Sequence, residues 1–248
     1  PVTEFGSPCV YGRVRARCTH LYDVRMHAAN DLTAAPAATL HAKAILFDMD
    51  GTLVDSTAEV EAMWTEFAHA NGVDPATVIE FAHGRPSRDT IATFAPDAIE
   101  RWEAYIHDGE HTRFLTVRSI PGAVEVVNSL RPGSWALVTS ALHHPARQRL
   151  RVIGIEPPEV VIGAEDVAAG KPHPEGYLAA ASALGVAPQD CVVFEDTDAG
   201  VCAGLAAGCT VVVVGGVETP ATEGLARIAD FSNVRAMSDD SGITLTLS

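Results

Sequence analysis

Short apolar runs alternate with amphipathic stretches along most of this chain, and the alternation predicts its elements. Runs rich in β-branched and aromatic residues predict strands that are buried on both faces. These runs are residues 44–47, 134–138, 160–162, 191–194 and 210–214. Apolar residues with helical spacing predict helices over residues 121–130, 144–152, 174–184 and 199–207. Because strands that alternate with helices form a parallel sheet covered on both faces, we predict an α/β fold with a Rossmann-like parallel-sheet core.

One stretch, residues 57–118, departs from this alternation. Apolar residues such as Trp64 and Phe67 recur at spacings of three and four, and helical patterns continue without a strand signal to the end of the stretch. We therefore predict a helical domain that is inserted into a core of residues 41–56 and 119–248. A helical segment packed permanently on the sheet is the alternative.

The first 40 residues differ from the rest of the chain. They hold four arginines against three acidic residues and show no hydrophobic periodicity. We predict that residues 1–40 form a disordered N-terminal extension, and they lack the apolar run of a secretory signal. A further hypothesis is that natural translation starts at Met26, which the intact mass of natively expressed protein would decide.

The composition excludes several classes of function. A formal net charge of −15 at pH 7 argues against nucleic acid as a partner, because that binding depends on Lys and Arg neutralising phosphates. No apolar run approaches the ~20 residues that a membrane span needs. The odd number of cysteines, five, favours a reducing compartment over a disulfide framework. We predict a cytoplasmic protein, a monomer or weak dimer, that acts on a small molecule.

Two carboxylates stand at the end of the first predicted strand. Asp48 and Asp50 directly follow the apolar run and are separated by one residue. In an open α/β sheet, ligands bind at the carboxyl ends of the strands, so paired acids there indicate chemistry rather than packing. Gly51 then permits a turn, and Ser56-Thr57-Ala58-Glu59 has the form of a capping box that begins a helix.

The stretch Asp48-Met49-Asp50-Gly51-Thr52 resembles motif I of the haloacid dehalogenase superfamily, which consists mostly of magnesium-dependent phosphatases. Three further matches follow in the family's order, each at a predicted strand end or loop. Thr139 resembles motif II, Lys171 in Gly170-Lys171-Pro172 resembles motif III, and Phe194-Glu195-Asp196-Thr197-Asp198 resembles motif IV. The resemblance implies a phosphoric monoester hydrolase of that fold, with residues 57–118 as a helical cap over its active site.

The resemblance also implies catalytic roles. Asp48 would attack phosphorus and form an aspartyl phosphate, while Asp50 would protonate the leaving oxygen and then activate water. Thr139 and Lys171 would bind the phosphoryl group, and Ser140 beside them would contact the substrate. A compact ammonium suits the place between a carboxylate and a phosphoryl group.

The acids of motif IV imply a Mg²⁺ site. Asp48, Asp196 and the backbone carbonyl of Asp50 would bind the ion, and Glu195 would bind it directly or through water. Adjacent carboxylates at one strand end repel each other, which supports a cation independently of the family. We also expect Asp198 to be the N-cap of the following helix.

The loop at residues 83–90 resembles the substrate-selecting loop of sugar and polyol phosphate phosphatases in this superfamily, which makes Arg85 a candidate substrate-binding residue. We therefore predict hydrolysis of a small sugar or polyol phosphate. Two alternatives are a phosphoglycolate phosphatase and a mutase of the β-phosphoglucomutase type. The mutases carry a histidine twelve residues past the nucleophile, where this chain has Val60. A catalytically silent binding protein on the same fold is an alternative of a different class.

Overall fold

The computed structural model describes residues 38–248, and a parallel sheet of six strands forms its centre. The strand order is β6-β5-β2-β7-β8-β9, and every neighbouring pair is parallel. The strands are β2 (Ala44–Phe47), β5 (Trp135–Val138), β6 (Val161–Ile162), β7 (Cys191–Glu195), β8 (Thr210–Val214) and β9 (Ala226–Ile228). The predicted α/β class and parallel-sheet core are confirmed. Because β2 lies between β5 and β7, its carboxyl end is central to the sheet edge.

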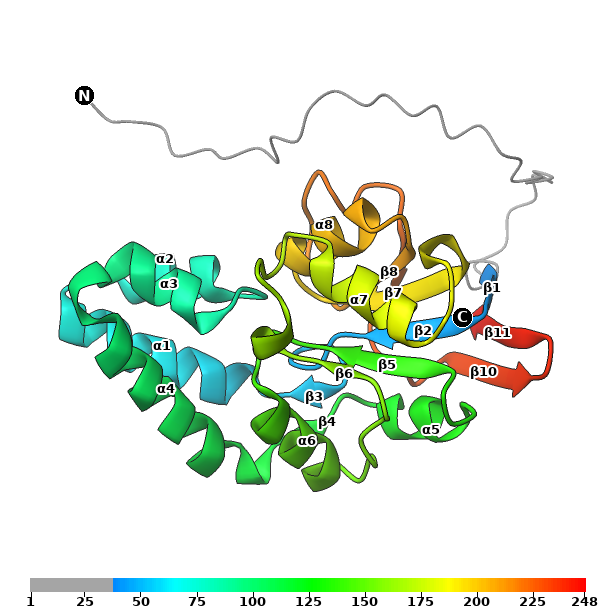
Figure 1. Cartoon of the computed structure of the whole chain (residues 1–248), viewed down its shortest axis with the longest axis horizontal. Coiled ribbons are helices and arrows are strands. Elements are labelled where there is room, and N and C mark those ends of the chain that lie inside the picture. Colours follow the sequence, from blue (N-terminus) through cyan, green and yellow to red (C-terminus); the bar gives the residue numbers. More distant parts are fainter. Residues whose placement is uncertain (1–37) are drawn as a thin grey trace, which may run out of the picture. The chain divides into compact units, whose positions relative to one another are not determined.

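Helices cover both faces of this sheet, as Figure 1 shows. On one face lie α7 (Glu175–Ala183) and α8 (Asp198–Ala206), and on the other lie α5 (Ala123–Asn128) and α6 (His143–Val152). Alternate side chains of β2 point to opposite faces: Leu46 packs in the cluster of α7 and α8, and Phe47 in that of α5 and α6. Phe47 stacks on Phe194 with ring centroids 5.3 Å apart. All four residues of β2 are buried, as its apolar sequence predicts.

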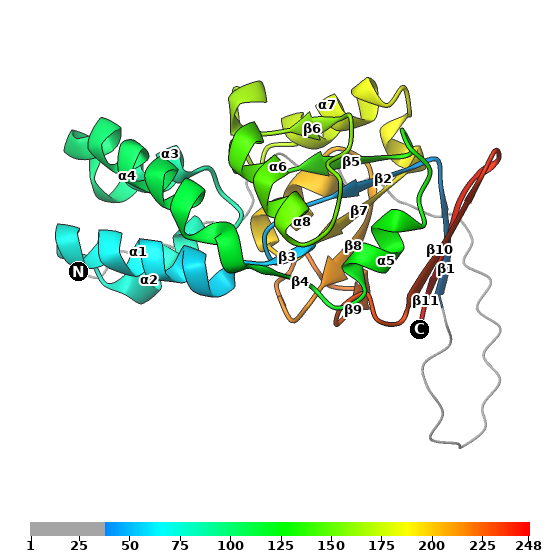
Figure 2. The same cartoon turned by 90° about the horizontal axis from the view of Figure 1, so that it is seen from below.

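Four helices lie between two short strands that pair with each other. These helices are α1 (Thr57–Asn71), α2 (Pro75–Ala82), α3 (Ser87–Phe94) and α4 (Ile99–Thr112), with 3₁₀ turns η1 (Pro96–Ala98) and η2 (Phe114–Thr116). The strands β3 (Val54–Asp55) and β4 (Arg118–Ser119) form an antiparallel ribbon, which lies between these helices and the sheet (Figure 2). Both connections of the helical segment therefore run through one ribbon. No helix in residues 38–248 is long and apolar enough to cross a membrane.

A second, antiparallel sheet has the order β1-β11-β10 and was not predicted. Its strands are β1 (Ala38–Ala42), β10 (Val234–Asp239) and β11 (Gly242–Leu247). The predicted boundary of the N-terminal extension, residues 1–40, is wrong, because residues 38–40 belong to β1 and pair with β11. Residues 1–37, and with them the proposed start at Met26, lie outside the described residues.

Of two predicted helix caps, Ser56 is at the predicted position but lacks the capping hydrogen bond, and Asp198 is wrong. Ser56 precedes α1 but makes no capping hydrogen bond; its Oγ donates to Asp50 Oδ1 at 2.6 Å. The N-cap of α8 is Thr197, whose Oγ1 accepts a hydrogen bond from the Gly200 amide at 3.1 Å. Asp198 is the first residue of that helix and accepts from the Thr219 hydroxyl instead. Thr197 is in the extended conformation that an N-cap requires, which decides between the two residues.

Candidate active site

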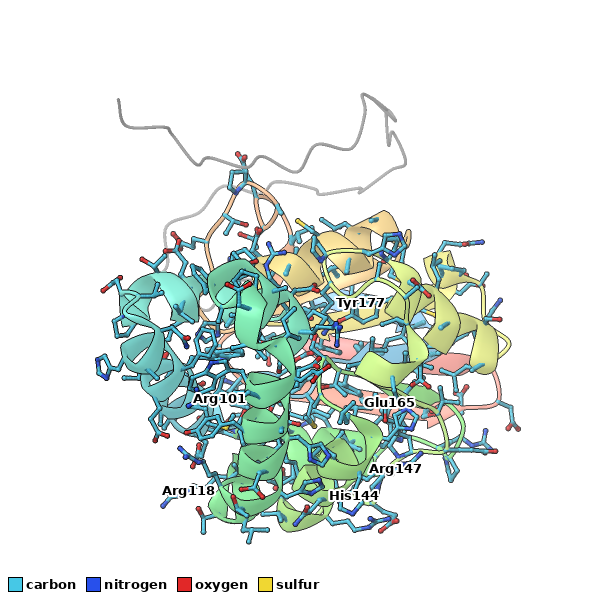
Figure 3. All side chains as sticks on the ribbon, turned by 60° about the vertical axis from the view of Figure 1, so that its left-hand side comes forward. Arg101, Arg118, His144, Arg147, Glu165 and Tyr177 are labelled. Atoms are coloured by element: carbon cyan, nitrogen blue, oxygen red, sulfur yellow. The ribbon has the colours of Figure 1, made fainter. Side chains whose placement is uncertain are left out.

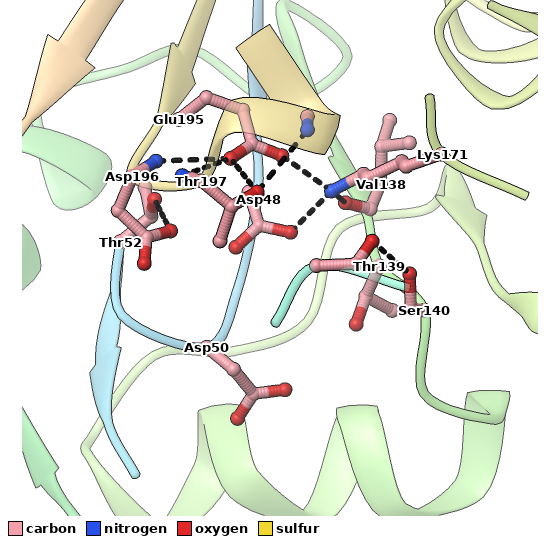
Figure 4. Close-up of polar contacts among 12 residues, drawn as sticks. Asp48, Asp50, Thr52, Val138, Thr139, Ser140, Lys171, Glu195, Asp196 and Thr197 are labelled. Atoms are coloured by element: carbon pink, nitrogen blue, oxygen red, sulfur yellow. Dashed lines mark hydrogen bonds and ion pairs between the residues drawn. The ribbon is translucent and has the colours of Figure 1, made fainter. Parts of the chain in front are cut away.

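The motif residues meet at the carboxyl edge of the parallel sheet (Figure 4). Asp48 follows β2, Thr139 follows the neighbouring β5, and Glu195 and Asp196 stand at the end of β7. Lys171 reaches the same place from the loop before α7. Parallel strands deliver their ends to one edge, so residues far apart in sequence become neighbours there. The roles predicted for these residues remain predictions.

Lys171 links the carboxylates of motifs I and IV. Its Nζ donates to Asp48 Oδ1, to Glu195 Oε1 at 2.6 Å and to the carbonyl of Val138 at 3.2 Å. Only 6% of its surface is exposed. Burial alone would lower the pKa of Lys171, but the carboxylates of Asp48 and Glu195 outweigh burial and raise it. The ammonium is therefore a fixed positive charge against the Asp48 carboxylate.

Glu195 is fully buried, and both of its carboxylate oxygens are occupied. Its Oε1 accepts from Lys171 and from the Tyr177 hydroxyl at 3.0 Å. Its Oε2 accepts from the amides of Asp196 and Thr197 and from the Thr197 hydroxyl, at 2.9–3.0 Å. A Cβ at Gly200 would overlap this carboxylate, so only glycine permits the close approach of α8. These contacts favour Glu195 as the residue that holds Lys171, not as a direct metal ligand.

A cation could be held here, because one oxygen each from Asp48, Glu195 and Asp196 lies within 4.8 Å of the others, and of these residues Asp48 and Asp196 keep an oxygen without a hydrogen bond in the described part of the chain. Among residues 38–248, Asp48 Oδ2 and Asp196 Oδ2 accept no hydrogen bond, while Asp196 Oδ1 accepts from the Thr52 hydroxyl at 2.9 Å. Burial raises the pKa of Asp48 to about 7 and that of Asp196 well above its usual range. A hard cation would offset this desolvation, so the donor set fits Mg²⁺.

The turn after β2 brings the motif I backbone close to the Asp196 carboxylate at Gly51. Its φ is +88°, in the left-handed region that favours glycine, and a Cβ there would overlap the Asp196 carboxylate. The turn therefore needs glycine both for its backbone and for the approach of motif I to motif IV.

The Asp50 carboxylate points away from the Asp48 and Lys171 pair (Figure 4). Its Oδ1 accepts from Ser56, and its Oδ2 accepts from Arg149 Nη1 of α6 at 2.7 Å. Both oxygens of the predicted acid–base residue are thus engaged by the protein. Asp50 nevertheless borders the same cavity as Asp48.

Two cavities adjoin at the site. The smaller, of about 120 Å³, is lined by Asp48, Asp50, Thr139 and Asp196 and by Arg85 from the helical segment. The larger, of about 490 Å³, extends between the helices and the core. Their shared lining residues are Ser87, Ile106, Glu110 and Ser140. A small ligand centred on Asp48 therefore has space to extend toward the helices.

The predicted substrate-binding residues lie where the helical segment meets the core. Arg85 borders the smaller cavity, and its guanidinium lies over the Phe81 ring at 4.8 Å. Ser140 lines both cavities, but its Oγ donates to the Gly84 carbonyl at 3.1 Å. Thr139 is buried beside the cavity, and its Oγ1 accepts from the Ala141 amide at 3.1 Å. Ser140 thus joins the loop before α3 to the core.

The sequence analysis missed residues that support the motifs. Tyr177 hydrogen-bonds Glu195, and burial raises its pKa well above the usual range, so the phenol stays a donor. In the sequence, Tyr177 is one apolar position of a predicted Ala-rich helix, so nothing marked it as a partner of Glu195. Arg149 and Glu110 form an ion pair at 3.1 Å, yet each stands in a helical pattern where a charged residue is usually solvated.

The chain is similar in sequence to known hydrolases and phosphatases. A model of haloacid dehalogenase-like hydrolases matches residues 42–208. Hexitol phosphatase A of Escherichia coli strain K12 is 40% identical over 181 residues, which cover 71% of this chain and 84% of that protein. Glycerol-1-phosphate phosphohydrolase 1 of Saccharomyces cerevisiae is 39% identical over 196 residues, 73% of this chain and 77% of that protein.

Solved structures resemble the chain over a similar share of its length. The crystal structure of a hydrolase from Pseudomonas syringae superposes with a TM-score of 0.66 at 23% identity, and covers 77% of this chain and 94% of that one. That likeness shows a shared fold. The matched range 42–208 contains all the motif residues that meet at the sheet edge. The chain therefore belongs to the haloacid dehalogenase-like hydrolase family.

Proposed function

We propose that this hydrolase removes phosphate from a small sugar or polyol phosphate through an aspartyl phosphate on Asp48, with Mg²⁺ as its cofactor. The predicted class of enzyme, a phosphoric monoester hydrolase, is confirmed by family members named as phosphatases. The observation that carries the proposal is the contact of Lys171 with Asp48, which borders the smaller cavity together with Thr139 and Asp196.

The proposed chemistry assigns one task to each group. One carboxylate oxygen of Asp48 attacks phosphorus, and the other would be held by the cation. Lys171 and Thr139 stabilise the charge on the phosphoryl oxygens. A proton passes from the Asp50 carboxyl to the leaving oxygen as the phosphorus–oxygen bond breaks, and Asp50 then takes a proton from the attacking water.

The metal site consists of oxygen atoms only. Asp48, Asp196 and the carbonyl of Asp50 would hold Mg²⁺, while Glu195 positions Lys171. When bound, the ion supplies positive charge that binds phosphate oxygens and stabilises the ionised carboxylates. That local charge is needed because the whole chain carries −15 and does not attract a phosphate ester.

The larger cavity supports a polyhydroxylated leaving group. Asp89, Glu103, Glu110 and Glu165 line it, and Glu165 lies on the core side, opposite α4 (Figure 3). Arg88 lines it as well and pairs with Glu103, while Glu110 pairs with Arg149. Carboxylates and guanidinium groups both form hydrogen bonds with hydroxyl groups, and the carboxylate of Asp89, which has no ion-pair partner among residues 38–248, would repel a second carboxylate. A sugar or polyol phosphate therefore fits better than phosphoglycolate. Relatives named for hexitol phosphates and glycerol 1-phosphate support the same class.

Val60 supports a phosphatase over a mutase. It lines the smaller cavity, so the side chain twelve residues past Asp48 faces the proposed reaction site. A valine cannot donate or accept the proton that a histidine would handle there. Water is therefore the proposed acceptor of the phosphoryl group.

We also propose residues 57–118 as a cap domain. The ribbon of β3 and β4 supports these limits, because both connections of α1 to α4 with the core pass through it. The hydrogen bond from Ser140 to Gly84 supports a cap that contacts the core beside the site.

Phosphate release from a panel of esters with Mg²⁺ present tests the proposal. The panel contains hexitol, hexose and glycerol phosphates, phosphoglycolate and p-nitrophenyl phosphate. We expect kcat/KM for the best sugar or polyol phosphate to exceed that for phosphoglycolate by at least about 10-fold. Phosphoglycolate as the best substrate would overturn the substrate class, and no turnover of any ester would indicate a silent binding protein.

Arg85→Ala should change substrate selection. We expect kcat/KM for the preferred sugar phosphate to fall about 10- to 100-fold, because Arg85 donors reach the leaving group, with a much smaller change for p-nitrophenyl phosphate. Steady-state kinetics on both esters measure the ratio. Arg101→Ala, at an arginine that stacks on Trp102, is the control and should change neither. Equal losses on both esters for Arg85→Ala would contradict the assigned role.

Chelation of divalent ions should abolish activity, and Mg²⁺ should restore it. Asp196→Asn should raise the Mg²⁺ concentration for half-maximal activity at least about 10-fold, because it removes one charged ligand. Asp198→Asn is the matched control, since Asp198 contacts Thr219 instead. A Mg²⁺ requirement that is the same in both variants would remove Asp196 from the ligand set.

A further inference from the structure

Arg149 is a buried cation outside the family motifs. It belongs to α6, only 2% of its side chain is exposed, and its guanidinium lies 3.7 Å from the centre of the Phe114 ring. Nη1 donates to Asp50 at 2.7 Å and Nη2 donates to Glu110 of α4 at 3.1 Å. One side chain of the core thus contacts both the proposed acid and the proposed cap.

The hydrogen bonds from Arg149 to Asp50 and Glu110 both go to protein carboxylates, although Arg149 borders the smaller cavity. Both terminal nitrogens donate to protein carboxylates, Phe114 covers the guanidinium, and Nε is buried without a partner among residues 38–248. Burial of a guanidinium is costly, and here two carboxylates compensate its charge. An arginine placed only for packing would not need to face both acids.

The same contacts fix the orientation of the Asp50 carboxylate. Arg149 holds Oδ2, and Ser56, the last core residue before the cap segment, holds Oδ1. Glu110 contacts the other nitrogen of the same planar guanidinium. Because the fork of an arginine is rigid, a shift of Glu110 moves or releases the donor that holds Asp50.

We propose that Arg149 is a positioning residue for Asp50, and that Glu110 acts through Arg149 to couple the orientation of Asp50 to the position of the cap. This inference rests on the proposed function, in which Asp50 protonates the leaving oxygen. Loss of Arg149 leaves the Asp48 and Lys171 pair in place but misplaces the acid.

First-turnover kinetics with two classes of ester test the inference. An alkyl phosphate such as glycerol 1-phosphate needs a proton on its leaving oxygen, whereas 2,4-dinitrophenyl phosphate does not. We expect Arg149→Met to slow the first turnover of the alkyl ester on the order of 10²-fold and that of the aryl ester by less than about 3-fold. Arg149→Lys should restore little of the first-turnover rate on the alkyl ester, because an ammonium group cannot contact both carboxylates as a planar guanidinium does.

A second experiment tests the route through Glu110. Glu110→Gln should lower the first-turnover rate of the alkyl ester but not that of the aryl ester. In the Arg149→Met background, Glu110→Gln should cause no further loss of rate. The double variant also removes both buried charges, so if Arg149→Met alone fails to fold, the double variant should itself show the loss on the alkyl ester and not on the aryl ester. Arg151→Met, at an arginine of the same helix that is 57% exposed, is the control and should change neither rate.

The outcomes separate this inference from the function on which it rests. Equal losses on both esters for Arg149→Met, or an undiminished effect of Glu110→Gln in its background, would overturn the inference. Asp50→Asn should show the same preference for the aryl ester as Arg149→Met. If Asp50→Asn slows both esters equally, the acid role of Asp50 in the proposed function fails instead.

Discussion

Asp48→Asn should release no phosphate from any ester that the unmodified enzyme hydrolyses, a fall in kcat of at least about 10⁴-fold. The amide has the shape of the carboxylate but is a far weaker nucleophile. The substitution also removes the negative charge that Asp48, together with Asp196, would supply to the proposed Mg²⁺ site. Steady-state phosphate release, with a good aryl leaving group included, measures the loss.

The fold should survive this substitution. Lys171 keeps its hydrogen bond to Glu195, and one of the buried like charges disappears. Thermal unfolding of the purified variant, compared with the unmodified protein, is the control. A folded Asp48→Asn variant that still turns over an alkyl phosphate would refute Asp48 as the nucleophile.

Lys171→Met should both inactivate and destabilise the protein. Methionine nearly fills the volume of the lysine side chain. Glu195 is fully buried and Asp48 is only 7% exposed, so the substitution leaves two buried carboxylates without their cation. Removal of one partner from a buried ion pair costs about 3–5 kcal/mol, because the remaining charge is uncompensated. Denaturant unfolding without Mg²⁺ measures this cost, and phosphate release with Mg²⁺ measures the lost activity.

The chain offers a matched control, because its one other lysine is Lys43. Lys43 pairs with Asp190 at 2.8 Å, but 64% of its side chain is exposed. Solvent screens such a pair, so Lys43→Met should leave stability and activity unchanged. Equal effects of the two substitutions would contradict the assignment of Lys171 to a buried, catalytic position.

Part of the site could be predicted from the sequence, because the hydrophobic pattern identifies the strands and parallel strands end at one edge of a sheet. The apolar run before Asp48 has no polar position, which is the pattern of a strand covered on both faces. Parallel strands end at one edge, so Asp48, Thr139 and Glu195 could be placed together without knowledge of their contacts. The helical period likewise predicted α1 through Trp64 and Phe67.

The remaining features depend on tertiary contacts that local patterns do not contain. Arg149 and Glu110 stand 39 residues apart in helices, where a charged residue is normally solvated, and only the meeting of α6 with α4 buries them. Ser56 has the sequence of a cap, but its hydroxyl donates to the carboxylate of Asp50 and makes no capping hydrogen bond. The second sheet pairs Ala38 of β1 with Leu247 of β11, which are far apart in the sequence, so the partner of β1 could not be predicted locally.

Trapping of the covalent intermediate tests the central claim most directly. The enzyme is mixed with its best phosphate ester and Mg²⁺, quenched in acid during turnover and cleaved into peptides for mass spectrometry. We predict that the peptide containing Asp48 gains the mass of one phosphoryl group, and that this gain is absent in Asp48→Asn. Active enzyme that carries the phosphoryl group on another residue, or on none under conditions where phosphate release is slower than ester cleavage, would contradict the account.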